Sequence, residues 1–167
     1  NDGIPLIRIG DILENGMIDI ENAKKLPAEF ANKYGFVRIN NKDILIAMTG
    51  ATIGKTGRYL SDEIGLLNQR VCKFIPVSIF SDFLWYILKT TQYTEYIKLI
   101  SFGGAQPNIS DEQLLDFCGV FPSIFEQRQI AKFLDNKKTQ IDNLIQKNEE
   151  MIKLLKENRA AIINKAV

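Results

Sequence analysis

One stretch of the sequence, Thr49–Gly57, combines glycines with a lysine and a threonine in an order that suggests phosphate binding. Phosphate-binding loops of nucleotide hydrolases follow the pattern G-x-x-x-x-G-K-[ST], in which backbone N–H groups and the lysine hold the phosphates. Here the residue five positions before Gly54 is Thr49 and not glycine. Such a loop must also open a helix, whereas Gly57–Leu60 has the composition of a strand. The spacing therefore argues against nucleotide binding.

The same loop is a candidate DNA contact. Glycine lets the backbone approach a phosphate closely, lysine and arginine bind phosphates in a salt-dependent way, and polar side chains can bond base edges. The surrounding sequence is locally basic, with seven lysines and arginines against three acids between Lys33 and Lys73. The alternative, a glycine-rich hairpin connection between two strands, is compatible with DNA contact. The candidate DNA-binding residues of this loop are Thr49, Thr52, Lys55, Thr56 and Arg58.

A second loop, residues 101–109, carries two glycines and two amides. Its Gln106 and Asn108 are candidates for DNA contact, because each amide can form two hydrogen bonds with adenine. The two residues can equally close a turn and cap the following helix, and both interpretations stay open. Nearby aromatic residues follow helical spacing, which is typical of a packed core and not of base stacking. They are Phe83, Trp85, Tyr86, Tyr93 and Tyr96.

The sequence contains no recognisable arrangement of residues for catalysis or metal binding. It contains no histidine, which removes the commonest general base and metal ligand. No serine-hydrolase, zinc-protease or methyltransferase motif occurs, and the acidic residues form no identifiable pair. Cys72 and Cys118 stand alone and indicate reduced thiols in a cytosolic protein. The sequence thus predicts a cytoplasmic binding protein that is not an enzyme and uses no cofactor or metal.

The composition is that of an ordinary globular protein. Of the 167 residues, 46% are hydrophobic and 25% are charged, with a formal net charge of +1. No apolar run approaches the roughly 18 residues that a membrane span needs, so no membrane partner is expected. A nucleic-acid binder usually has a basic surplus. Any positive surface must therefore be a local patch.

Residues 1–122 predict a mixed-sheet domain of the α/β (α+β) class. Short β-type runs end at turn residues, and apolar residues at helical spacing predict a helix over 79–100. A shorter helix is predicted over 27–33, and Ser110–Gln113 fits a capping box at the start of another. The expected strands are 5–9, 17–20, 36–39, 44–48, 57–60, 70–75 and 117–121.

Residues 123–167 predict a single long helix. A second capping box at Ser123–Glu126 starts it, and neither glycine nor proline follows. About 40 residues would extend roughly 60 Å. Apolar residues alternate four and three positions apart, which predicts a coiled-coil seam that another helix must bury. Asn148 interrupts this seam. It either fixes the register of the two paired helices or lies at the solvent-exposed edge of the seam. The predicted helix-pairing residues are Ile141, Ile145, Asn148, Ile152, Leu155 and Ile162.

Three stretches, taken together, resemble the specificity subunit of type I restriction-modification enzymes. Each stretch is a weak match by itself, but the three occur in the family's order and spacing and together span nearly the whole chain. They are Gly3–Ile12, then Asp43–Lys55, and then Gln106–Ile109 with Glu126-Gln127 and the closing Ile162–Val167.

The resemblance implies a non-catalytic recognition module. Residues 1–122 would be a target-recognition domain that reads one half of a bipartite double-stranded DNA target, and residues 123–167 a spacer and dimerisation helix. The implied partners are DNA adenine methyltransferase (modification) subunits, and through the complex a motor/endonuclease subunit. Complete subunits have two domains and two helices. The chain would then be half of a longer subunit or a half-length version that dimerises.

Antiparallel pairing of two such helices would place two recognition domains at opposite ends of the pair. A spacing of roughly 60 Å is under two turns of B-DNA, at about 34–36 Å for each turn. A competing hypothesis is a coiled-coil assembly or scaffold protein that binds no DNA.

Overall fold

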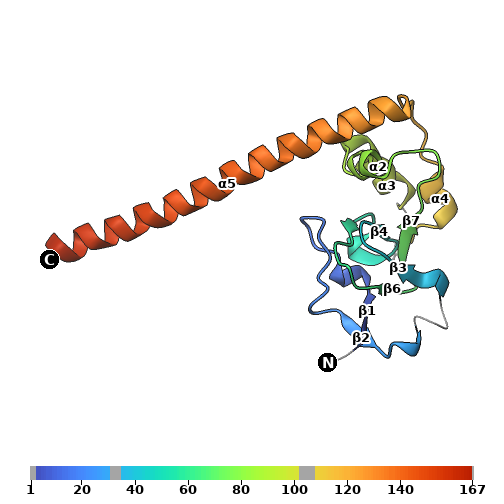
Figure 1. Cartoon of the computed structure of the whole chain (residues 1–167), viewed down its shortest axis with the longest axis horizontal. Helices are drawn as coiled ribbons and strands as arrows, with labels where there is room; N and C mark the ends of the chain where they lie inside the picture. The colour runs from blue at the N-terminus through green and yellow to red at the C-terminus, as the bar shows by residue number, and fades with distance from the viewer. Residues whose placement is uncertain (1–2, 31–34, 102–107, 167) are drawn as a thin grey trace. The chain divides into compact units, whose positions relative to one another are not determined.

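The computed structural model describes residues 3–30, 35–101 and 108–166 (Figure 1). Contacts divide the chain into two compact units, Asn1–Phe121 and Pro122–Val167. The first unit combines two small sheets with short helices, and the second is a single helix. The predicted α+β class and the long C-terminal helix are both confirmed.

The first sheet has four strands in the order β2-β1-β6-β3. The strand β1 (Ile4–Ile7) pairs antiparallel with β2 (Lys24–Leu26) and parallel with β6 (Gly65–Leu67). The strand β6 pairs antiparallel in turn with β3 (Arg38–Ile39). Because β1 and β6 run in the same direction, the connections that leave their carboxyl ends lie at the same edge of the sheet.

The second sheet has three strands in the order β5-β4-β7. Its central strand β4 (Ile44–Ala47) pairs antiparallel with β5 (Thr56–Arg58) on one side and with β7 (Val71–Phe74) on the other. The connection between β4 and β5 is the glycine-rich loop of the sequence, and it includes a 3-10 turn at Gly50–Thr52.

Strand β4 is buried on both faces and separates two hydrophobic clusters. Successive side chains of a strand point to opposite faces. Leu45 and Ala47 join a cluster with Ile7, while Ile44 and Ile46 join a cluster with residues of the helices. Burial on both sides explains why the strand is a continuous apolar run, and why it was predictable from the sequence.

Two helices replace the single one predicted over 79–100. They are α2 (Ser81–Ile87) and α3 (Thr91–Ile100). The hydroxyl oxygen of Thr90 accepts a hydrogen bond from the backbone N–H of Tyr93 at 3.3 Å, which caps the start of α3. The sequence prediction was wrong here because helical periodicity continued across a break that a threonine cap makes favourable.

The short helix α4 (Asp111–Leu115) and several strands test the remaining predictions. The capping box at Ser110–Gln113 is present at the start of α4. Residues 17–20 form only isolated bridges, and residues 117–121 form no strand, so both strand predictions were wrong. Strands β2 and β6 were not predicted from the sequence. Strand β2 contains two lysines, which an edge strand tolerates, and strand β6 begins with a glycine, which is uncommon in strands. The helix predicted over 27–33 lies partly outside the described residues.

The helix α5 (Ile124–Ala166) forms the second unit. Its predicted capping box is present, since the Ser123 N–H donates to Glu126 Oε2 at 2.9 Å and the Glu126 N–H donates to Ser123 Oγ at 3.4 Å. The 43 residues of the helix correspond to a length of about 64 Å. From Asp135 to Ala166 every residue is exposed. Across the described ranges, no helix is long and apolar enough to cross a membrane.

Candidate nucleic-acid interface

Four connecting segments lie at one edge of the first unit. Ile7 and Leu67 end the parallel strands β1 and β6 as neighbours, and Ala47 at the end of β4 pairs with Val71 at the start of β7. The short connection from β6 to β7 joins the two sheets at this edge. We call this edge of the first unit the loop edge. Its four segments are residues 8–11, 48–55, 68–70 and 108–109.

Backbone hydrogen bonds hold these segments together. The Asn68 N–H donates to the Ile7 carbonyl at 3.0 Å, and the Met48 N–H donates to the Arg70 carbonyl at 3.0 Å. The Ile109 N–H donates to the Met48 carbonyl at 2.9 Å, and Thr49 forms an antiparallel bridge with Asn108. The two loops that the sequence selected therefore meet. Gln106, the other amide of the second loop, lies outside the described residues.

Glycine at position 54 has a packing role. Its φ is +78°, in the left-handed region that favours glycine. A Cβ added there would lie 2.4 Å from Cγ2 of Ile97, a buried residue of α3. The following Lys55-Thr56 pair leads into β5 and not into a helix, as the sequence predicted. The glycine thus lets the loop pack against α3, and the helix N-terminus that would hold a nucleotide phosphate is absent at this loop.

The glycine-rich loop carries two threonine hydroxyls and one lysine ammonium as donor groups. The hydroxyl oxygens of Thr49 and Thr52 are buried and meet no hydrogen-bond partner within the described part of the chain. An unpaired buried hydroxyl costs about 1–3 kcal/mol, but because both oxygens are buried, a ligand could reach them only after the loop rearranges. The Lys55 ammonium pairs with Glu14 Oε1 at 2.6 Å, and the Glu14 side chain is 88% exposed. The Lys55 side chain is 21% exposed, and the ion pair is weak because its acidic partner is almost fully in solvent.

The last two candidates of this loop are less accessible. Thr56 is only 5% exposed within β5. The Arg58 guanidinium donates to Asp82 Oδ1 at 2.5 Å and lies 5.5 Å from the centre of the Trp85 ring. Lys89 lies over the same ring at 4.2 Å, and partial desolvation there lowers its pKa. Thr56 and Arg58 therefore lie behind the loop and against the helices, and not at its tip.

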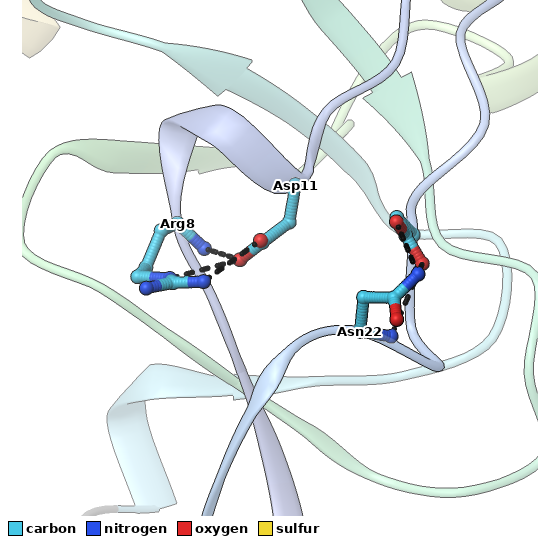
Figure 2. Close-up of polar contacts among 4 residues, drawn as sticks. Arg8, Asp11 and Asn22 are labelled. Carbon is cyan, nitrogen blue, oxygen red and sulfur yellow. Dashed lines mark hydrogen bonds and ion pairs between the residues drawn. The ribbon is translucent and has the colours of Figure 1, made fainter.

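The structure adds polar residues that the sequence reasoning did not select. Gln69 and Arg70 are exposed in the turn between β6 and β7, and Arg8 follows β1. Figure 2 shows the Arg8 side chain bonded to Asp11. The acid three positions after Arg8 could have indicated from sequence that this side chain is held in place. The sequence could not, however, show that segment 8–11 lies beside the other loops. Among the residues that the structure describes, no group of histidine, cysteine, aspartate and glutamate could hold a metal ion.

Comparison with known proteins identifies the family. Residues 1–153 match the type I restriction modification DNA specificity domain. The type I restriction enzyme MjaVIII specificity subunit of Methanocaldococcus jannaschii is 32% identical over 163 residues, covering 92% of this chain and 37% of that protein. The chain thus spans little more than a third of that relative's length. It belongs to the family of type I restriction-modification specificity subunits, as the sequence resemblance predicted.

Solved structures support the fold. A chain from a structure of a type I R-M system matches with a TM-score of 0.71 at 21% identity, covering 99% of this chain and 38% of that one. The HsdS subunit from Thermoanaerobacter tengcongensis matches with a TM-score of 0.57 at 19% identity, covering 86% of this chain and 32% of that one. Membership of a specificity family agrees with the expectation of a non-catalytic component.

Proposed function

We propose that the loop edge binds double-stranded DNA and reads one half of a bipartite target. The recognition module would be residues 1–122, with residues 123–167 as the spacer helix. The observation that carries this proposal is the meeting of two loops far apart in sequence, through the Thr49–Asn108 bridge and the bond from Ile109 to Met48. Each loop was selected for side chains that bind phosphates or bases, and their contact makes one continuous surface of them.

The candidate residues divide by position. Lys55 would bind a phosphate and supply salt-dependent affinity. Asn108, and with it Gln106, would bond base edges, since amides suit adenine. Thr49 and Thr52 would bond the DNA only once binding exposes their hydroxyls, which are buried in the structure. The remaining two candidates, Thr56 and Arg58, would hold the loop from behind through β5 and α2.

The helix α5 would pair with a second helix. The seam residues Ile141, Ile145, Ile152, Leu155 and Ile162 are each between 51% and 62% exposed, and Asn148 lies among them at an exposed position. Exposed apolar residues at coiled-coil spacing favour burial against a partner helix. The partner would be a second copy of this chain or a second half of a longer subunit, in antiparallel orientation. DNA adenine methyltransferase subunits would dock on the helices, and a motor/endonuclease subunit would join through the complex, in the cytoplasm.

The test is a selection from random duplexes, with the chain supplied together with the modification subunit of its own system. We expect enrichment of duplexes that share a short fixed sequence, split into two parts if two modules pair. Binding of the selected duplex should weaken as salt increases, because phosphate contacts release counterions. Recovery of unselected sequence, with no retention above that of the modification subunit alone, would contradict the proposal.

A second candidate function is a coiled-coil assembly protein that does not bind DNA. The exposed apolar stripe of α5 favours a helix partner whether or not DNA is bound. This hypothesis expects partner binding that is insensitive to salt, and no shift of any duplex. The same selection distinguishes the two functions, because an assembly protein enriches no sequence.

A further inference from the structure

An arginine that follows β1 is held by an acidic residue at one edge of its guanidinium. Asp11 Oδ2 accepts hydrogen bonds from the Arg8 N–H at 2.8 Å and from Arg8 Nε at 3.3 Å, and Oδ1 accepts one from Nη2 at 3.2 Å. The Asp11 residue is 7% exposed, whereas the Arg8 side chain is 48% exposed. Figure 2 shows the Arg8 guanidinium and backbone N–H bonded to the Asp11 carboxylate.

The Asp11 contact leaves the outer side of the guanidinium available. Nη1 has no partner in the part of the chain that the structure describes, and Nη2 uses only its inner hydrogen toward Asp11. The guanidinium is planar, so fixing its inner edge also fixes the direction of the outer Nη1–Nη2 edge. A donor pair that is oriented before binding loses less side-chain entropy when it meets a ligand.

Segment 8–11 lies at the loop edge. Cδ1 of Ile9 is 3.9 Å from the position that a Cβ would occupy on Gly50. A Cβ added to Gly10 would meet no atom within 4 Å, so the backbone beside Arg8 is open to an approaching partner. The bond from Asn68 to the Ile7 carbonyl ties the segment to the neighbouring turn.

We propose that Arg8 is a DNA-contacting residue of the loop edge, with its outer Nη1–Nη2 edge bound to two adjacent acceptor atoms of duplex DNA and Asp11 as its positioning residue. The inference rests on the proposed function and adds a residue to it. Two sources on DNA offer such a pair of acceptors. They are the two oxygens of one phosphate, and O6 with N7 of a guanine in the major groove.

The experiment uses the chain with its modification subunit, the selected duplex, and a duplex of the same length with that sequence scrambled. Arg8→Lys keeps the charge but loses the ability to form two parallel hydrogen bonds, and Arg8→Gln removes the charge as well. The control is Lys25→Gln, because Lys25 is an exposed cation on β2 opposite Pro5, near the other end of β1. Both Arg8 variants should bind the selected duplex about tenfold more weakly, and the control should bind as wild type does.

The two duplexes identify the ligand. An equal loss on both assigns Arg8 to a phosphate, and a loss confined to the selected duplex assigns it to guanine. Wild-type affinity of both Arg8 variants on both duplexes would overturn the inference and leave the proposed function standing. A wild-type complex that binds no duplex would overturn both.

The positioning role of Asp11 needs its own measurement, because Asp11→Asn also removes contacts within the fold. We expect Asp11→Asn to weaken DNA binding severalfold in the wild-type background and to have no further effect once Arg8 is glutamine. Thermal unfolding of both variants records any loss of stability separately. An equal loss of affinity in both backgrounds would show that Asp11 acts through the fold and would remove its positioning role.

Discussion

The substitution Gly54→Ala should strongly destabilise the first unit, for two separable reasons. Gly54 has a φ of +78°, and an L side chain in this region costs about 1–2 kcal/mol. The new Cβ would also lie 2.4 Å from Cγ2 of the buried Ile97, and forced overpacking of a core typically costs about 1–3 kcal/mol. Together these terms lower the free energy of unfolding by about 2–5 kcal/mol.

The assay is urea unfolding followed by the fluorescence of Trp85, the single tryptophan. Trp85 belongs to α2, so its signal reports on the first unit and not on α5. The matched control is Gly10→Ala. Gly10 has open space around its added Cβ and no positive φ, so this change should alter the free energy of unfolding by less than about 1 kcal/mol.

A double mutant separates the steric cost from the backbone cost. Ile97→Ala alone creates a cavity and should lower the free energy of unfolding by about 2–5 kcal/mol. In that background the Cβ of Gly54→Ala no longer meets Cγ2, so only the backbone cost of about 1–2 kcal/mol should remain. Gly54→Ala within about 0.5 kcal/mol of wild type would refute the reasoning. Strictly additive losses would refute its steric part.

Three further outcomes are expected. Lys55→Ala should lower the slope of log affinity against log salt by roughly one on every duplex, and an unchanged slope in a salt titration would remove Lys55 from the interface. Ile145→Asp combined with Ile152→Asp should weaken helix pairing by about a hundredfold or more. Sedimentation equilibrium tests this, and a wild-type chain that stays monomeric at high concentration would contradict pairing with a second copy. Burial raises the pKa of the Cys72 thiol, which lowers its thiolate fraction at neutral pH. The exposed Cys118 should therefore react with maleimide faster than Cys72 at neutral pH, and the rate for Cys72 should approach that of Cys118 only as pH rises. Equal rates at neutral pH, measured by peptide mass spectrometry, would contradict this.

The elements that the sequence predicted well are those specified by local pattern. Strand β4 is an uninterrupted apolar run because both of its faces are buried. Helix α5 has a capping box at its start and no glycine or proline after it. The break at Thr90 was missed because one side-chain cap outweighed a helical periodicity that continued through it.

The candidate site was predictable in part. Composition and spacing selected the glycine-rich loop and Asn108, but their contact is a long-range feature that neither loop encodes alone. Arg8 and Arg70 come from other connections, and only the pairing order of the strands brings these to the same edge. Burial likewise separated Thr56 from the accessible residues, because its place within β5 depends on the sheet that forms around it.

The charge count from the sequence overstated how positive this surface is, and the difference leads to a last prediction. The count covered residues 33–73, and two of the cations in that range pair with acids outside it, as Lys55–Glu14 and Arg58–Asp82. Because Glu14 is 88% exposed, its pair contributes only about 0.2–1 kcal/mol. While Lys55 holds this pair, the Glu14 carboxylate offsets part of its charge and weakens its attraction for a phosphate.

Glu14→Gln should therefore strengthen DNA binding by up to about fivefold at low salt, since this is the factor that 1 kcal/mol represents. The gain should shrink as salt screens the original pair. It should also shrink strongly when Lys55 is alanine, because most of the benefit passes through that ammonium; what remains is the loss of repulsion between Glu14 and the phosphates. Fluorescence anisotropy with the selected duplex measures all four combinations. An equal gain with and without Lys55 would mean that Glu14 only repels the DNA, and that the observed ion pair does not restrain the lysine.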